Sequence, residues 1–221
     1  MDIDLVAFPT RTDRTQYMVR RYGAILNGRM LDVGCDKAVL RDLVPNLEYT
    51  GIDIGGTPTL TLNLEQVASL PFPGNAFDCV VCTDVLEHLD NLHAMFDELV
   101  RVTRGHLLLS LPNCWVAARA PIRRGMGSPR FYGLPTDRPT DRHKWFFNIT
   151  DGLEFVMEHA KRRGLTVENL CVNEKPRSEW LRGLRRMMYP SLDRYLNRYA
   201  HTLWALLAKP PFSGNCINGR N

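Results

Sequence analysis

Apolar residues follow two alternating patterns along the chain, and each pattern predicts one kind of element. Residues 105–111 form an apolar run, and residues 29–33 and 77–83 are also rich in apolar residues, as is typical of strands buried on both faces. Apolar positions three to four residues apart predict a helix over residues 92–102. Weaker forms of these patterns predict helices over residues 12–26, 38–43, 150–163 and 178–199, the last broken at Pro190, and strands over residues 49–54, 59–63, 165–172 and 202–208. This alternation predicts an α/β fold with a mostly parallel, doubly wound sheet.

Residues 112–148 interrupt the alternation with a stretch rich in proline, glycine and arginine. A loop of this length inside a compact domain is typically functional or disordered. Residues 210–221 are rich in proline, glycine and asparagine, and we expect them to be disordered. The pattern therefore predicts a single domain over residues 1–209, which includes an additional helical segment at residues 176–199.

The composition is that of one globular domain of 221 residues, of which 44% are hydrophobic and 24% are charged. No apolar run approaches the ~20 residues that a membrane-spanning helix needs. The first residues are acidic and lack the basic and apolar regions of a secretory signal, so we expect a cytoplasmic protein.

Charge divides the chain into two unequal halves. Residues 1–113 hold 9 Lys and Arg against 15 Asp and Glu, net −6, whereas residues 114–221 hold 19 against 9, net +10. A basic half favours an anionic acceptor, a nucleic acid or a membrane surface as partner, although a basic face can also simply be solvated.

Six cysteines occur without regular spacing, which in the expected compartment predicts free thiols. Cys79 and Cys82 form a C-x-x-C pair, but on a strand these two positions point to opposite faces. We therefore interpret both as core residues and predict no metal site.

Two acids at the ends of successive strands indicate a bound nucleoside. Asp32 ends one strand, and Gly34 allows a tight turn with close backbone approach to a ligand. Asp53 closes the next strand about 20 residues later, where an acid is the usual acceptor for both ribose hydroxyls of an adenosine. Open α/β sheets bind ligands beyond this edge of the sheet.

The residues after Gly34 decide which nucleoside cofactor fits. A dinucleotide needs further glycines for its pyrophosphate, whereas Cys35, Asp36 and Ala38 occur here. An acid would repel a pyrophosphate, but Asp32 suits the cationic group of an amino acid. The pattern therefore predicts S-adenosylmethionine, with S-adenosylhomocysteine as the product of transfer.

Four segments in order resemble the class I S-adenosylmethionine-dependent methyltransferases, and within them the small-molecule group similar to ubiquinone and menaquinone methyltransferases. The segments are residues 31–35 (LDVGC), 51–53 (GID), 70–73 (LPFP) leading into 77–81 (FDCVV), and 83–89 (TDVLEHL). The rest of the chain looks like the second half of the same fold. The resemblance implies a Rossmann-like, doubly wound sheet of seven mostly parallel strands with helices on both faces.

The resemblance also implies which residues bind the cofactor. The expected residues at the methionine end are Asp32, Gly34, Cys35 and Thr83, and those at the ribose and adenine are Asp53, Ile54, Leu64 and Asn63, the last through its amide oxygen. Asp36 and Ala38 replace the second and third glycines of the family's turn, and Asp tolerates a positive φ better than most residues. This departure leaves open a weakened or lost cofactor site.

Methyl transfer from a sulfonium is an in-line displacement, which needs a base when the acceptor is a hydroxyl. Relatives place a substrate lid in the region of residues 114–148, and within it we expect His143 to be the base, oriented by Asp141. His88 is a second candidate, which could instead form only local hydrogen bonds. The aromatic residues after His143 could stack on a sugar or ring, or only anchor the lid to the core.

The acceptor expected from this lid is small and anionic. The expected acceptor-binding residues are Tyr132, Arg142, Lys144 and Trp145. Arginines in the lid would act as forked clamps for phosphate or carboxylate. Residues 131–147 resemble stretches in methyltransferases of surface-glycan assembly, which favours a phosphate-linked or acidic sugar as the acceptor and oxygen as the methylated atom.

Other interpretations stay open. Residues 178–199 combine arginines with apolar residues such as Trp180, so this segment could lie on an anionic inner membrane surface, cover the sheet or form a dimer face. A nucleic-acid methyltransferase is disfavoured because the chain lacks zinc ligands and an Asn/Asp-Pro-Pro-Tyr/Phe motif. A non-catalytic scaffold is the third possibility, and cofactor binding separates it from both enzymes.

Overall fold

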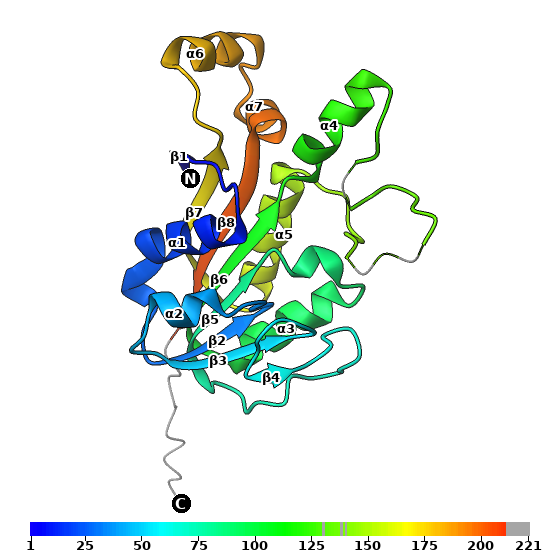
Figure 1. The fold of residues 1–221 in the computed structure, drawn as a ribbon. Coiled ribbons are helices and arrows are strands. Elements are labelled where there is room, and N and C mark those ends of the chain that lie inside the picture. The colour runs from blue at the N-terminus through cyan, green and yellow to red at the C-terminus, as the bar shows by residue number, and fades with distance from the viewer. Residues whose placement is uncertain (130, 138, 140, 211–221) are drawn as a thin grey trace, which may run out of the picture.

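The computed structural model describes residues 1–129, 131–137, 139 and 141–210, and it contains one sheet with helices on both faces (Figure 1). The eight strands lie in the order β1-β7-β8-β6-β5-β2-β3-β4. They are β1 (Asp2–Leu5), β2 (Arg29–Val33), β3 (Glu48–Asp53), β4 (Leu60–Thr61), β5 (Phe77–Thr83), β6 (Thr103–Pro112), β7 (Thr166–Glu174) and β8 (Ala200–Ala208). β8 runs antiparallel to both of its neighbours, and the other pairs are parallel. The predicted α/β fold is confirmed.

The described residues form seven α-helices and two short 3-10 helices. They are α1 (Arg11–Tyr22), α2 (Val39–Leu43), α3 (Leu92–Val102), α4 (Cys114–Arg124), α5 (Ile149–Arg162), α6 (Glu179–Met188) and α7 (Leu192–Tyr199), with short 3-10 helices η1 (Gly23–Ile25) and η2 (Leu86–His88). α1 and α2 cover one face, and α3 and α5 cover the other (Figure 1). Successive residues of β5 alternate between these faces, since Val80 packs with α3 and α5 whereas Val81 packs with α1 and α2. The sheet is therefore doubly wound, as predicted.

The cysteines follow the same alternation. Cys79 and Cys82 belong to core clusters on opposite faces of the sheet. Both are buried free thiols, as are Cys35, Cys114 and Cys171. Their interpretation as core residues agrees with the structure, and Cys216 lies outside the described residues.

β1 is a strand that the apolar pattern does not predict, so the expected number of seven strands is one too low. It pairs in parallel with β7, from Asp2 opposite Cys171 to Leu5 opposite Glu174. Its two aspartates, Asp2 and Asp4, form ion pairs with Arg21 of α1. Because β1 lies at an edge of the sheet, polar residues are tolerated there, and a four-residue alternation is too short to signal a strand.

α4 lies inside the stretch expected to be a loop, so that expectation is wrong for residues 114–124. Asn113 caps the helix, because its side-chain oxygen accepts a hydrogen bond from the backbone N–H of Trp115 at 3.1 Å. Gly125 ends the helix at a φ of 65°. The proline within the helix, Pro121, obscured it in the sequence, since proline removes one backbone hydrogen bond and normally marks a break.

The segment predicted to be helical before and after Pro190 forms α6 and α7, which differ in burial. α7 packs Tyr195 and Leu196 into the core. No residue of α6 is buried, so the interpretation of this helix as a cover for the sheet is wrong. The interpretations of α6 as a membrane-surface or dimer-forming helix stay predictions.

Within the described residues, no helix has both the length and the apolar character needed to cross a membrane. The predicted disorder of residues 210–221 falls mostly on residues 211–221, which lie outside the described residues.

Candidate active site

Asp32 and Asp53 end adjacent strands, and both carboxylates lie at the same edge of the sheet. β2 and β3 pair in parallel with Asp32 opposite Gly51, two residues before Asp53. Asp32 is buried and accepts a hydrogen bond from the Tyr49 hydroxyl at 2.8 Å. Burial raises the pKa of Asp32 to about 6, with a smaller contribution from the charge of Asp53. The structure thus brings together the two acids that the sequence predicts.

Gly34 forms a turn that no other residue could form without a clash. Its φ is 76°, and a Cβ atom at this position would lie 2.2 Å from Cγ2 of Val85. The Gly34 N–H donates to the carbonyl oxygen of Ile52 at 2.8 Å, which holds the turn against β3. The expected close approach of backbone to a ligand therefore has a local structural basis.

The residues that replace the family's other two glycines adopt positive φ angles as well. Asp36 has a φ of 46° and Ala38 a φ of 53°. The backbone N–H of Asp36 donates to Oδ2 of Asp53 at 2.8 Å, and Oδ1 of Asp53 accepts from the N–H of Gly55 at 3.1 Å. The turn therefore has positive φ angles at Asp36 and Ala38 without glycine there, and hydrogen bonds to Asp53 hold it in place.

A cavity of about 50 Å³ lies between this turn and α1. Asp32, Gly34, Cys35 and Thr83, all expected at the methionine end of the cofactor, line it. Arg11 and Arg14 of α1 also line it, and they pair with Asp36 and Asp84 respectively. Because the cavity is small and charged side chains line it, it suits a small, charged part of a ligand.

The residues expected beside the adenine, Ile54, Asn63 and Leu64, do not line this cavity. Ile54 is 69% exposed, and Leu64 is buried beneath the surface. Oδ1 of Asn63 accepts a hydrogen bond from the N–H of Glu65 at 3.0 Å. The amide oxygen that we expect to face an adenine is therefore already engaged within its own turn.

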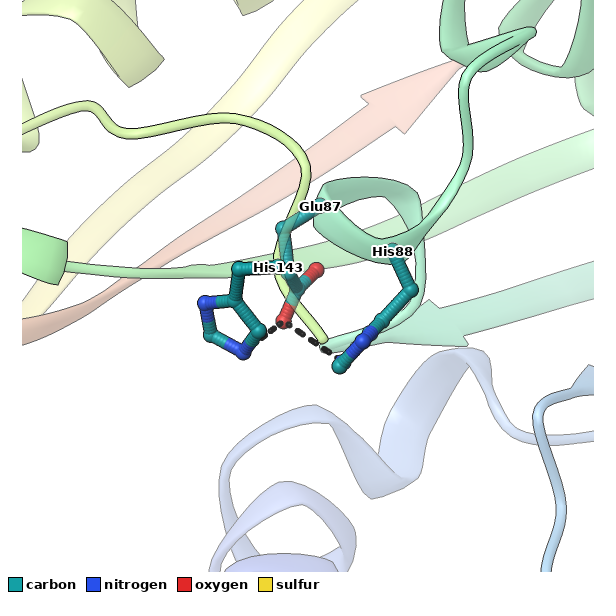
Figure 2. A group of neighbouring side chains, drawn as sticks. All are labelled: Glu87, His88 and His143. Atoms are coloured by element: carbon teal, nitrogen blue, oxygen red, sulfur yellow. Dashed lines mark ion pairs between the residues drawn. The ribbon is translucent and has the colours of Figure 1, made fainter. Parts of the chain in front are cut away.

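Glu87, His88 and His143 form a second group at the carboxyl end of β5 (Figure 2). Nε2 of His88 lies 3.8 Å from Oε1 of Glu87, and Nε2 of His143 lies 4.0 Å from the same oxygen. The two imidazole rings are perpendicular, with centroids 4.6 Å apart. The structure thus brings together both histidines that the sequence singles out as candidate bases.

Each histidine has a separate partner on its other ring nitrogen. Nδ1 of His143 lies 2.8 Å from the Tyr132 hydroxyl, while Nδ1 of His88 lies 2.9 Å from Oδ1 of Asp141. The expectation that Asp141 orients His143 is therefore wrong, because the Asp141 carboxylate contacts His88 instead. The sequence could not assign this pair, since a position two residues away in the chain need not be the neighbour in space.

Lys144 and Trp145, which we expected to bind the acceptor, fasten the lid to the domain. Lys144 forms ion pairs with Glu65 and Asp90. Trp145 donates from Nε1 to the carbonyl oxygen of Leu89 at 2.7 Å. Arg142 contributes its carbonyl oxygen, 3.1 Å from Nδ1 of His88. For Trp145 the contacts support the alternative in which the aromatic residue anchors the lid.

Glu87 is the residue that the sequence analysis missed. It is fully buried, and neither carboxylate oxygen has a hydrogen-bond partner among the described residues. Burial, with the charge of Asp84, raises the pKa of Glu87 well above its ordinary value. An acid directly before a histidine at the end of a buried strand was the available signal.

A large cavity between α4 and α7 was also missed. Its volume is about 700 Å³, and apolar side chains line it together with guanidinium groups: Trp115, Ala118, Ile122, Phe146, Tyr189, Asn197, Arg119, Arg123, Arg194 and Arg198. A neighbouring cavity of about 280 Å³ shares Arg119, Arg123 and Arg198. No Asp or Glu is among the described residues that line either cavity.

Comparison with known proteins places this geometry in a family. A family described as "Methyltransferase domain" matches residues 12–168, which include both groups of site residues. The chain belongs to this methyltransferase-domain family. The resemblance to class I S-adenosylmethionine-dependent methyltransferases is therefore confirmed.

Individual relatives are distant from this methyltransferase domain. It is 25% identical over 119 residues to ubiquinone biosynthesis O-methyltransferase of Photorhabdus laumondii, a match over 45% of this chain and 49% of that protein. The chain thus spans about half the length of this curated relative.

Solved structures confirm the fold of the methyltransferase domain. It is similar to a SAM-dependent methyltransferase from Archaeoglobus fulgidus, with a TM-score of 0.58, 18% identity and coverage of 91% and 96% of the two chains. It is also similar to magnesium protoporphyrin IX methyltransferase of Synechocystis PCC 6803, solved with bound SAH, with a TM-score of 0.53, 17% identity and coverage of 90% and 82%.

Proposed function

We propose that this protein transfers a methyl group from S-adenosylmethionine to an oxygen atom of a small, anionic acceptor, such as a phosphate-linked or acidic sugar. The observation that supports an anionic acceptor is the cavity between α4 and α7, because arginines line it and none of its described lining residues is acidic. The family match supports methyl transfer. The relative from Photorhabdus laumondii, an O-methyltransferase by name, supports oxygen as the target.

The Asp32 and Asp53 turn fits S-adenosylmethionine in charge and shape. Asp32 would face the amino group of the methionine portion, and Asp53 would accept from the ribose hydroxyls while it holds the turn. Gly34 brings the backbone close enough for this contact. When bound, the cofactor supplies a methyl group on a positively charged sulfur atom.

Two aromatic side chains in contact link the lining of the large cavity to His143. Phe146 lines the cavity and packs edge-to-face on Tyr132, with ring centroids 4.9 Å apart. Tyr132 in turn contacts His143. We propose that an acceptor with its anionic group at Arg119 and Arg198 places its hydroxyl on the Phe146 side of the cavity, the side nearest to Tyr132 and His143.

Charge repulsion within the cavity supports an anionic occupant. Burial, with the positive charge of Arg198, lowers the pKa of Arg119. Arg119 and Arg185 both lie over the ring of Tyr199, at 5.5 and 4.4 Å from its centroid. A phosphate or carboxylate would relieve this repulsion and could accept forked hydrogen bonds from the guanidinium groups.

The transfer needs orientation and one proton acceptor. The acceptor oxygen would form an ether bond with the methyl carbon while the bond from that carbon to sulfur breaks, in line, which would leave S-adenosylhomocysteine as the second product. The hydroxyl proton passes to an imidazole, for which we propose His143, with His88 as the neighbouring alternative. Asp141 would position His88 rather than His143.

Two measurements test this function. Titration with S-adenosylhomocysteine should show micromolar binding, and its absence in folded, cofactor-free protein would favour the scaffold interpretation. Tritiated methyl transfer should then be compared for sugar phosphates, dodecyl phosphate, dodecanol and short RNA. We expect transfer to a phosphate-bearing hydroxyl compound, whereas transfer to RNA alone would overturn the proposed acceptor class.

A pair of matched arginine variants tests whether the acceptor binds in the cavity between α4 and α7. Arg119→Ala should raise the KM for the phosphate-bearing acceptor about tenfold or more, the loss expected of one charged hydrogen bond. Arg162→Ala is the control, because Arg162 lies on the exposed side of α5 beside Glu158. His143→Ala should leave S-adenosylhomocysteine affinity unchanged and lower kcat. Unchanged kcat in that variant would exclude His143 as the base.

A further inference from the structure

We propose that Glu87, His88 and His143 form a binding site for one divalent transition-metal ion. The ligand atoms of these three side chains lie within 4.8 Å of one another. Figure 2 shows that both imidazole rings are directed at the Glu87 carboxylate. The role of the ion in catalysis rests on the proposed function, but its binding does not.

Glu87 provides the first reason for a metal. The carboxyl group is fully buried, and among the described residues neither of its oxygens has a hydrogen-bond partner. Buried carboxylates normally have hydrogen bonds, ion pairs or metal ligation, because an isolated buried charge is strongly unfavourable. The histidines lie too far from Oε1 for hydrogen bonds, and a cation bound to Oε1 would give the carboxyl group a partner at bonding distance.

The distances provide the second reason. The Nε2 atoms of His88 and His143 lie 3.8 and 4.0 Å from Oε1 of Glu87, too far for hydrogen bonds. With metal–ligand bonds of ~2.1 Å, two ligands lie ~3.0 Å apart in cis octahedral, ~3.4 Å in tetrahedral and ~4.2 Å in trans positions. The observed separations therefore fit ligands of one ion after shifts below about 1 Å.

The orientation of the histidines provides the third reason. Nδ1 of His143 contacts the hydroxyl of Tyr132, and Nδ1 of His88 contacts the carboxylate of Asp141. Histidines that bind metals commonly have such a partner on the other ring nitrogen, which fixes the tautomer and the ring plane. Here both rings present Nε2 to Glu87 and Nδ1 to a partner.

The donor set selects the class of ion. Two imidazoles and one carboxylate suit Zn²⁺, Co²⁺, Mn²⁺ or Fe²⁺ rather than Ca²⁺, which prefers oxygen ligands. Three protein ligands leave positions open for water or for an acceptor oxygen. Such an ion would polarise the acceptor hydroxyl, so His143 would act as a ligand in place of its proposed role as the base.

Metal titration in the absence of cofactor and acceptor tests the site directly. Untagged protein is treated with EDTA, dialysed and titrated with Co²⁺ and Zn²⁺, with calorimetry for stoichiometry and Co²⁺ absorption for the coordination geometry. We expect one equivalent to bind to the wild type. Glu87→Gln and His143→Ala should each weaken binding at least about 100-fold, and Tyr132→Phe about 10-fold.

His106→Ala is the matched control, because His106 also lies beside a carboxylate, with Nε2 3.4 Å from Glu168, but outside this group. This variant should bind the metal as the wild type does. Affinity for S-adenosylhomocysteine, measured without metal, verifies that each variant is folded. Wild-type protein that binds S-adenosylhomocysteine but no metal overturns this proposal alone, as does full metal binding by Glu87→Gln. Metal binding without cofactor binding overturns the proposed function alone.

Discussion

Asp32 and Glu87 are buried acids at the same edge of the sheet, but only one of them has its hydrogen-bonding capacity used. Asp32 accepts from the Tyr49 hydroxyl, and the nearby Asp53 accepts two backbone N–H groups. Glu87 has no hydrogen-bond partner among the described residues. The cofactor side is therefore held in shape by the protein's own hydrogen bonds. The group of Glu87, His88 and His143 instead contains a buried carboxyl group without a hydrogen bond, which favours an external partner.

The largest expected effect concerns the turn that shapes the cofactor side. Gly34→Ala would place a Cβ atom 2.2 Å from Cγ2 of Val85 at a φ of 76°. Strain and overpacking together should lower the free energy of unfolding by about 4 kcal/mol, measurable by urea denaturation.

A double variant and a control variant show whether the clash or the positive φ causes the loss of stability in Gly34→Ala. Val85→Ala in the Gly34→Ala background should recover part of the loss, because it removes the clash but not the positive φ. Gly183→Ala in α6 should cost nothing, since a Cβ atom at this position would meet no other atom within 4 Å and alanine favours helix. A Gly34→Ala protein of wild-type stability would show that the turn is not rigid.

Asp53→Ala should have the next largest effect, on cofactor affinity. The substitution removes the acceptor for the N–H groups of Asp36 and Gly55 as well as the expected ribose contact. We expect binding of S-adenosylhomocysteine to weaken at least about 100-fold by calorimetry, or about 3 kcal/mol. Metal binding at Glu87 should be unchanged, which would show that the cofactor site and the proposed metal site are independent. Asp42→Ala, at an exposed site, is the control.

Asp32 should make the free energy of unfolding depend on pH. Its pKa rises from 3.8 to about 6 in the fold, chiefly by burial. A raised pKa means that the folded state holds the proton more tightly, so stability falls as pH rises between these values. Relative to Asp32→Asn, the wild type should lose roughly 2 kcal/mol of stability between about pH 4.5 and 6. Equal slopes for both proteins in pH-dependent denaturation would contradict the assignment.

The smallest effects should come from the two arginines of α1 at the cofactor cavity. The Arg11 and Asp36 pair is exposed, so Arg11→Ala should change stability by less than about 0.5 kcal/mol. Arg14 pairs with the less exposed Asp84, which also accepts from Ser110, so Arg14→Ala should cost about 1 kcal/mol. Thermal denaturation of both variants tests this order, and a larger loss for Arg11→Ala would reverse it.

The two sides also differ in how far the sequence predicts them. Asp32, Gly34 and Asp53 lie at the ends of strands with strong apolar patterns, so their place at one edge followed from the sheet itself. His88 and His143 were each predicted as candidate bases, but their common neighbour Glu87 was not. Their meeting depends on a long irregular segment folding back onto η2, where the backbone N–H of Lys144 donates to the carbonyl oxygen of Glu87 at 2.8 Å. No local pattern encodes such a contact.

The sequence analysis did not predict α4 and β1 because both depend on contacts with distant parts of the chain. α4 contains Pro121, which locally favours a break, and the caps and packing of the helix outweigh that preference. β1 is stable only because β7 offers it an edge with which to pair. Both elements exist through contacts with distant parts of the chain.

The short strands at the two ends of the sheet have a consequence for solubility. β7 and β8 are each nine residues long, and an exposed edge of that length would recruit strands from other molecules. β1 covers β7 and leaves outside a four-residue edge whose two aspartates pair with Arg21, while β4 ends the opposite side with two residues. We therefore expect truncation of β1 to expose the edge of β7, where strands of other molecules could pair and the protein could aggregate.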